Sequence, residues 1–180
     1  MKSEFRNHPP RRLFIERERL GFEDALKGVR EEFGRDYPLR LNGVDVRTEE
    51  VEPVSDPSHP EHGALGLVNY ASAEQIDGAL TLAAAATAGW AAIPVTGRAD
   101  ILRRAAALLA ERQDDVAAWE VYEAAKSWTE ALADVDEAIN YLRFYAVQAE
   151  TLSAAMAPYR PRGVVAVSRH GTSRPRSRAE

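Results

Sequence analysis

The sequence of 180 residues contains no cysteine and only 2 methionines. The absence of cysteine excludes disulfide bonds, thiolate metal sites and cysteine nucleophiles together, and it is compatible with a reducing compartment. The amino-terminal residues include no apolar core of the kind that a signal peptide requires. The most apolar run, residues 79–92, is too short to span a bilayer. We therefore expect a soluble cytoplasmic protein with no membrane partner.

Charge of either sign is modest, with 23 Lys and Arg against 28 Asp and Glu. This mildly acidic balance gives no reason to expect nucleic acid as a partner. Basic residues gather at the carboxyl end, where residues 168–180 hold four arginines against one glutamate. The length fits one domain that can bury a hydrophobic core.

Short motifs that bind nucleotides or present a nucleophile are also missing. The sequence has no Gly-x-Gly-x-x-Gly turn, no phosphate-binding Gly-Lys-Ser loop and no Gly-x-Ser-x-Gly elbow. The residues by themselves therefore indicate neither a cofactor nor a nucleophile.

Hydrophobic periodicity in the first part of the chain predicts one helix and a hairpin. Apolar residues recur at helical spacing over residues 16–33, and Gly34 follows as a carboxyl-terminal stop. Asn42 and Gly43 accept the positive φ angles of a tight turn, so residues 39–46 are predicted to form a strand pair.

Two further extended regions are predicted. Residues 51–54 and 64–71 form a second strand pair around a proline-containing turn and a loop with two histidines. The β-branched run Val164 to Val167 is suited to a buried parallel strand. Strands this short require packed helices for stability.

Three helices are predicted between these regions, and their starts can be read directly. Ser72 opens the first with a capping box, Thr96 opens a second that ends near Lys126, and Ser127 opens the third with another capping box. In the first helix one face carries Ile76, Leu80, Ala83 and Trp90. In the second we expect Leu102, Ala105, Leu109 and Val116 inward and Arg103, Arg104, Arg112 and Gln113 outward. In the third we expect a buried stripe of Leu132, Val135, Ile139, Leu142 and Ala146. The fold class is a helix-rich α/β domain.

The loop between the second pair of strands contains metal-ligating residue types. His59 and His62 lie three residues apart, beside Asp56 and Glu61. Such ligands need a rigid frame, and a proline-rich loop does not promise one. A solvated turn is the favoured interpretation.

Two features near the third helix also carry candidate chemistry. Glu130, Asp134 and Glu137 lie on one helical face and could mimic half of a di-metal carboxylate site, but the partnering Glu-x-x-His motif is absent. An exposed acidic face is favoured. Lys126 could be a nucleophilic amine, yet pairing with Glu123 at a helix end explains it adequately.

The order of motifs along the chain is more informative than any one of them. It comprises Asn42-Gly43, Asp56-Pro57, the alanine-rich stretch Ala79 to Trp90, Thr96-Gly97-Arg98, Leu102-Arg103-Arg104-Ala105-Ala106 and Glu123-Ala124-Ala125-Lys126. This order resembles the N-terminal part of an aldehyde dehydrogenase, whose members write Asn-Pro at the second position and Glu-x-Gly-Lys at the last. Asp56 and Ala125 are mild departures from that pattern.

Within that superfamily, residues 122–139 are similar to the pyrroline-5-carboxylate dehydrogenases, as are Phe5-Arg6-Asn7 and residues 159–165. The resemblance implies NAD-dependent oxidation of glutamate γ-semialdehyde to glutamate in proline catabolism, by homo-oligomeric enzymes. It also implies a division of the chain. We expect an N-terminal helical extension at 1–37, the N-terminal part of the aldehyde dehydrogenase domain with an incomplete nucleotide-binding domain at 38–167, and a disordered basic tail at 168–180.

The family pattern is interrupted after Val167. Family members continue Ile-Ala-Pro-Trp-Asn-Phe-Pro, whereas this chain continues Ser168-Arg169-His170-Gly171-Thr172-Ser173-Arg174. One choice among the synonymous codons for Val167 to Arg174, GTA TCG CGC CAT GGA ACT TCC CG, encodes these residues. Regrouped from the last A of GTA, the same bases read ATC GCG CCA TGG AAC TTC CCG, which encodes the family motif. We therefore interpret residues 168–180 as the product of a shifted reading frame.

This interpretation has a consequence for catalysis. The family attacks the aldehyde with a cysteine thiolate, stabilises the oxyanion with the motif Asn, transfers hydride to NAD and hydrolyses the thioester with a Glu base. The chain has no cysteine, so we assign no catalytic, cofactor-binding or metal residue and expect it alone to be inactive and not to bind NAD.

Two alternatives remain open. The chain could assemble with a separately encoded downstream half into a working dehydrogenase. It could instead be a small helical protein-binding module whose arginine-rich tail contacts an acidic partner.

Overall fold

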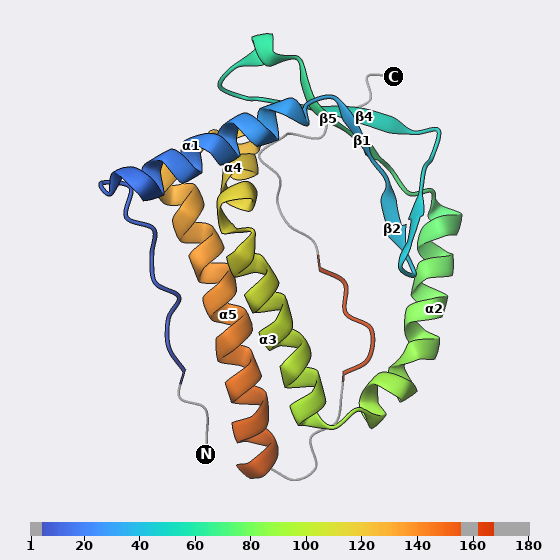
Figure 1. Cartoon of the computed structure of the whole chain (residues 1–180). Coiled ribbons are helices and arrows are strands. Elements are labelled where there is room, and N and C mark those ends of the chain that lie inside the picture. The colour runs from blue at the N-terminus through green and yellow to red at the C-terminus, as the bar shows by residue number, and fades with distance from the viewer. Residues whose placement is uncertain (1–4, 156–161, 168–180) are drawn as a thin grey trace.

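A computed structural model describes residues 5–155 and 162–167 of the chain. Figure 1 shows a helical bundle on one side and small sheets on the other, with one helix standing apart from the bundle. The bundle consists of α1 (Glu16–Glu31), α3 (Val95–Glu111), α4 (Gln113–Ala124) and α5 (Trp128–Ala155). The separate helix is α2 (Ala73–Ala92).

Helix α1 confirms the first predicted helix, although it ends two residues earlier. Its buried face consists of Phe22, Leu26 and Val29, which recur at helical spacing and pack mainly against α4. Gly34 follows with a φ of 78°, as expected for a residue that ends a helix.

Helix α5 is the central element of the core. Ser127 Oγ accepts from the backbone N–H of Glu130 at 3.3 Å, and the Glu130 carboxylate accepts from the N–H of Ser127 at 3.2 Å, so the predicted capping box is confirmed. The predicted inward stripe is also confirmed. Leu132, Val135, Ile139 and Ala146 are buried and Leu142 is half-buried.

The predicted helix from Thr96 to Lys126 is wrong in one respect, because it is two helices. The chain breaks at Arg112, with φ −106° and ψ 19°, and α4 starts at Gln113. Gln113, expected to point outward, is buried, and its Nε2 donates to Asp136 of α5 at 2.7 Å. This buried side-chain hydrogen bond is therefore made by the residue that directly follows the break.

The sheets are small. β4 (Val51–Ser55) and β5 (Ala64–Asn69) pair antiparallel, and β2 (Leu39–Leu41) and β3 (Val44–Val46) form the hairpin, so both predicted pairs are confirmed. Asn42 and Gly43 have φ angles of 49° and 79°, as the tight turn requires. Sequence reasoning missed β1 (Arg35–Tyr37), which pairs parallel with β5.

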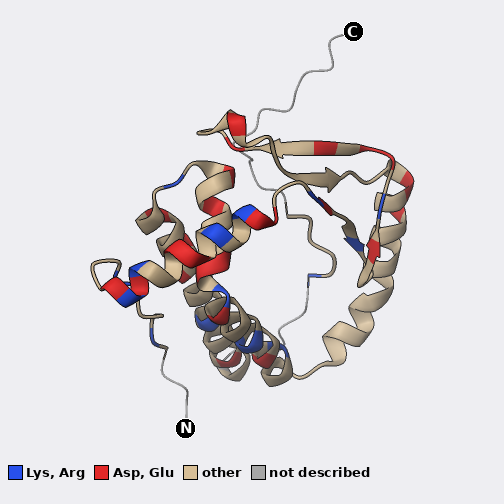
Figure 2. Ribbon diagram, turned by 45° about the horizontal axis from the view of Figure 1, so that its top comes forward, with Lys and Arg blue, Asp and Glu red and all other residues tan. Residues whose placement is uncertain are grey.

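Helix α2 is held mostly by its own local interactions. Ser72 and Gln75 form the predicted capping box. No side chain of α2 is buried, and Ile76, Leu80 and Trp90 are each about half exposed. Figure 2 shows that charged residues are confined to its first part.

No single helix among residues 5–155 is long and apolar enough to cross a membrane; α2 and α3 would satisfy the length and composition criteria together, but they meet at a bend of 114°.

The prediction of a buried strand at Val164 to Val167 is wrong in this chain. These residues have no regular secondary structure, and Val165 and Val167 are 68% and 90% exposed. The segment lies between α3 and α2 (Figures 1 and 2) and pairs with none of the described strands. A β-branched run becomes a strand only where another strand satisfies its backbone groups. Residues 159–161 of the family resemblance and the tail at 168–180 lie outside the described residues.

Candidate functional site

Residues from three parts of the chain line a cavity of about 500 Å³. The loop between β4 and β5 contributes Asp56, His59 and His62, and the junction between α4 and α5 contributes Lys126. The carboxyl-terminal half of α1 closes a third side. Candidate residues that lie far apart in the sequence therefore meet in one place.

Asp56 is the best-held polar group of the cavity. Its side chain is 2% exposed, and its Oδ1 accepts the backbone N–H groups of Ser58 at 2.8 Å and His59 at 3.0 Å. Burial acts to raise its pKa, but these hydrogen bonds and the one from His62 outweigh burial, so the pKa of Asp56 lies below its ordinary value. The carboxylate is therefore ionised at neutral pH and fixes the start of the loop.

The two histidines differ in how firmly they are held. His62 Nδ1 lies 2.9 Å from Asp56 Oδ2, and the His62 ring packs near the rings of Phe33 and Tyr122. His59 is largely exposed and pairs with Glu61 at 3.0 Å. Their ring centroids are 5.0 Å apart, so the loop brings both imidazoles to the mouth of one cavity.

Lys126 is placed by a residue in the left-handed conformation. Ala125 ends α4 with φ 54° and ψ 33°, a position that glycine takes more easily. Sequence reasoning paired Lys126 with Glu123, whereas in the structure its Nζ contacts Glu120 at 3.0 Å and also Asp134. The ammonium group thus bridges α4 and α5, and this structural role supports the preferred interpretation over that of a nucleophile.

The acidic face of α5 is exposed, as expected. Glu130, Asp134 and Glu137 all lie on the surface. The hydrogen bond from the Ser127 side chain lowers the pKa of Glu130 most, and the hydrogen bond from the Ser127 backbone lowers it further. Asp134 forms an ion pair with Lys126. The structure brings no histidine to this face, so it gives no support to a di-metal site among the described residues.

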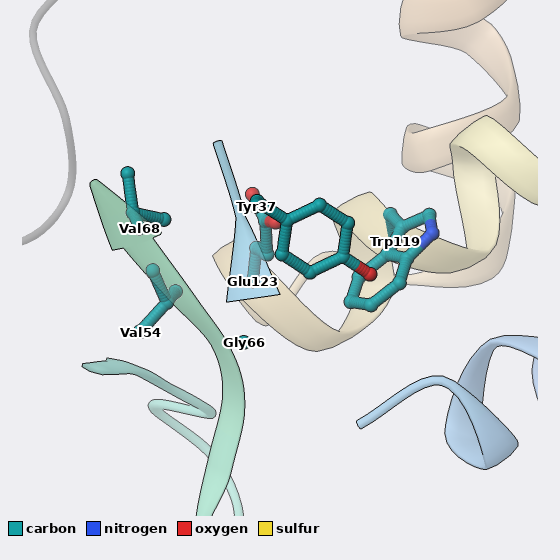
Figure 3. Close-up of a pocket in the computed structure, with 6 residues that line it drawn as sticks. All are labelled: Tyr37, Val54, Gly66, Val68, Trp119 and Glu123. Atoms are coloured by element: carbon teal, nitrogen blue, oxygen red, sulfur yellow. The ribbon is translucent and has the colours of Figure 1, made fainter. Parts of the chain in front are cut away.

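A second, smaller cavity of about 220 Å³ lies between the sheet and α4 (Figure 3). Tyr37 and Trp119 form one wall, with ring centroids 5.9 Å apart, and Glu123 provides a carboxylate. Burial raises the pKa of Tyr37, and the charge of Glu32 adds to the effect. Sequence reasoning missed this cavity, although a glycine inside a strand pattern, here Gly66 beneath the Tyr37 ring, is a signal of close approach.

Comparison with known proteins identifies the fold. The model of the aldehyde dehydrogenase family matches residues 44–172. This chain belongs to the aldehyde dehydrogenase family.

Named relatives within that family agree with one another. The 1-pyrroline-5-carboxylate dehydrogenase 2 of Halalkalibacterium halodurans is 40% identical over 152 residues, which are 84% of this chain and 29% of that protein. A structure of 1-pyrroline-5-carboxylate dehydrogenase from Thermus thermophilus matches with a TM-score of 0.82 and 36% identity, over 88% of this chain and 31% of that one. A Thermus 1-pyrroline-5-carboxylate dehydrogenase with bound NAD matches with a TM-score of 0.77 and 39% identity, over 80% and 28% of the two chains.

Both the superfamily and the subgroup resemblance are thereby confirmed, as is the helix-rich α/β fold class. The chain spans less than a third of the length of these relatives.

The junction from β5 to α2 does not offer the kind of pyrophosphate site that a dinucleotide cofactor such as NAD uses in strand-to-helix turns. A pyrophosphate needs free backbone N–H groups at a strand-to-helix turn, usually rich in glycine. In this chain β5 leads into α2 through Ser72, and the capping box between Ser72 and Gln75 already occupies two of those N–H groups.

Proposed function

We propose that this chain is the N-terminal part of an NAD-dependent 1-pyrroline-5-carboxylate dehydrogenase, the activity that oxidises glutamate γ-semialdehyde to glutamate. The observation that carries the proposal is the match to the Thermus thermophilus enzyme, at a TM-score of 0.82 over 88% of the chain. The bacterial relatives that bear the same name at 34–40% identity support the choice of substrate.

The chain alone is proposed to be inactive. The family reaction starts from a cysteine thiolate, and the sequence of 180 residues has no cysteine. Residues 1–37 then serve as an N-terminal helical extension, residues 38–167 as part of the dehydrogenase domain, and residues 168–180 as an out-of-frame tail. No catalytic, cofactor-binding or metal residue of the family reaction is assigned to this chain, and a cytoplasmic location stays a prediction.

Exposed apolar surface supports the same proposal. Helix α2 buries none of its side chains, and Leu80 and Trp90 are half exposed. Val165 and Val167 in the neighbouring segment are more exposed still. Apolar surface of this extent on adjoining elements is typical of a face that another part of a fold covers.

The decisive experiment is to sequence the genomic DNA from the codon of Val164 onward. We expect a single-base correction near Val167 to restore the Trp-Asn-Phe-Pro motif and a long downstream frame. The corrected gene should then give an enzyme that reduces NAD in the presence of pyrroline-5-carboxylate, measured by NADH absorbance, while the 180-residue chain gives no rate above buffer. An unrelated in-frame series of codons, or an inactive corrected product, would contradict the proposal.

The split enzyme is the second candidate, and the exposed face of α2 is the surface that a separately encoded half would cover. In that case a neighbouring open reading frame encodes the cysteine and glutamate motifs. Co-expression of that frame with this chain should produce NADH, whereas either product alone should not. A rate from the second product alone would exclude a role for this chain in a split enzyme.

A further inference from the structure

The β4–β5 loop holds metal-ligating side chains that the proposed dehydrogenase reaction does not use. His59, Glu61 and His62 each offer one ligand atom, and these atoms lie within 4.8 Å of one another. We propose that these residues bind a divalent transition metal of the zinc class. Two imidazoles and one carboxylate are a donor set that zinc accepts in proteins, with a fourth position left for water or another ligand.

The printed distances are close to those of a zinc site, and the two exposed side chains are free to adjust. In a tetrahedral site with zinc bonds of about 2.0–2.2 Å, neighbouring ligand atoms are about 3.3–3.6 Å apart. His59 Nδ1 and Glu61 Oε1 already lie 3.0 Å apart. Both side chains are more than half exposed, so they can reorient without disturbing the core.

His62 is the fixed ligand. Its Nδ1 lies 2.9 Å from Asp56 Oδ2, and the side chain of His62 is 14% exposed. Asp56 Oδ1 accepts two backbone N–H groups and its Oδ2 faces Nδ1, so the carboxylate acts as an acceptor and Nδ1 is the ring nitrogen placed to donate. The lone pair of Nε2 is then available for a metal. A carboxylate behind the ring is the usual support of a metal-binding histidine.

The structure also holds the buried end of the loop in place, which the sequence alone did not promise. Backbone N–H groups of Ser58 and His59 hold Asp56, and the rings of Phe33 and Tyr122 pack near His62. The loop is therefore anchored to the body of the protein at its buried end while its exposed end carries the other two ligands. A bound metal would tie the two ends together at the mouth of the cavity of about 500 Å³.

Cobalt(II) titration of the untagged 180-residue chain tests the site, because visible absorbance reports tetrahedral coordination. We expect one equivalent of cobalt(II) to bind and zinc to displace it. His59→Ala and Glu61→Gln should each weaken binding by about tenfold or more, in line with the effect of removing even an indirect support of a metal ligand. These exposed positions are chosen because a change at His62 would also disturb its packing.

Two matched variants serve as controls. Glu49→Gln removes an exposed carboxylate elsewhere on the surface, and His170→Gln removes an imidazole outside the described residues. Both should bind cobalt(II) as tightly as the unaltered chain, and circular dichroism should show the same helix content in all variants. Equal affinity in His59→Ala, Glu61→Gln and the unaltered chain, or no tetrahedral spectrum at millimolar cobalt(II), would overturn the proposal.

Discussion

Phe22 of α1 is the side chain whose removal should cost the most stability. It is 0% exposed, and its ring meets that of Trp128 edge-on at a centroid distance of 5.4 Å. Truncating a buried Phe to Ala costs about 3–5 kcal/mol, from lost burial and from the cavity left behind. The aromatic pair itself accounts for about 0.5–1.5 kcal/mol. Because α1, α4 and α5 share this core, we expect Phe22→Ala at the upper end of the range.

Phe14 offers a matched control, since its side chain is 86% exposed. Phe14→Ala should change the free energy of unfolding by less than about 0.5 kcal/mol. Urea unfolding followed by circular dichroism measures both variants, with the slope of the transition compared to check that the same surface is exposed. The free energy of unfolding of a whole domain is only about 5–15 kcal/mol, so Phe22→Ala could prevent folding. Phe22→Leu, expected to cost about 1 kcal/mol, is a less destabilising variant of the same side chain. Equal losses in Phe22→Ala and Phe14→Ala would refute the placement of this core.

Three further outcomes follow from local geometry. Ser127→Ala removes the capping box of α5 and should cost about 1 kcal/mol in urea unfolding, while Ser153→Ala, exposed in the same helix, should cost nothing measurable. Gly43→Ala forces a side chain onto a φ of 79° and should cost about 1 kcal/mol, whereas Gly28→Ala, in open space within α1, should stabilise by about 0.5–1 kcal/mol. Burial raises the pKa of Asp136, so the contribution of the protonated carboxyl to stability is present below the ordinary carboxyl pKa and is lost as pH rises through the folded pKa. Asp136→Asn should therefore be more stable than the unaltered chain at pH 7. Thermal unfolding should show this difference in stability vanishing below about pH 4.

Features set by neighbouring residues were predictable from the sequence. The Asn42-Gly43 turn, both capping boxes and the inward stripe of α5 each depend on a pattern within a few residues. Such patterns act through backbone conformation and helix periodicity, which do not require knowledge of the rest of the fold. The same holds for the ordered motifs that revealed the family.

Features set by distant contacts were not predictable. The helix break at Arg112 accompanies the hydrogen bond from Gln113 to Asp136, and β1 exists because β5 lies beside it. Periodicity placed Gln113 outward because it describes a straight helix. The strand predicted at Val164 to Val167 is absent because none of the described strands lies beside this segment to pair with it.

The candidate site shows the same division. Sequence reasoning found His59, His62 and Lys126 separately, by residue type. That they line one cavity depends on where the β4–β5 loop meets the α4–α5 junction. It also depends on Asp56, which was noted only as a neighbour of the histidines and as a turn residue, and which the structure places as their buried support.

Helices α2 and α5 show what a capping motif can and cannot tell. Both start with a capping box that the sequence makes equally clear, yet α5 buries Leu132, Val135 and Ile139 while α2 buries nothing. A cap fixes where a helix begins because it satisfies backbone N–H groups that lie within one turn. Which face becomes covered depends on partners elsewhere in the fold. Both helices lie within the residues matched to the family, and the chain covers only 29% of a relative such as that of Halalkalibacterium halodurans. Motif order can therefore identify the family even where, as along α2, no side chain is buried among the described residues.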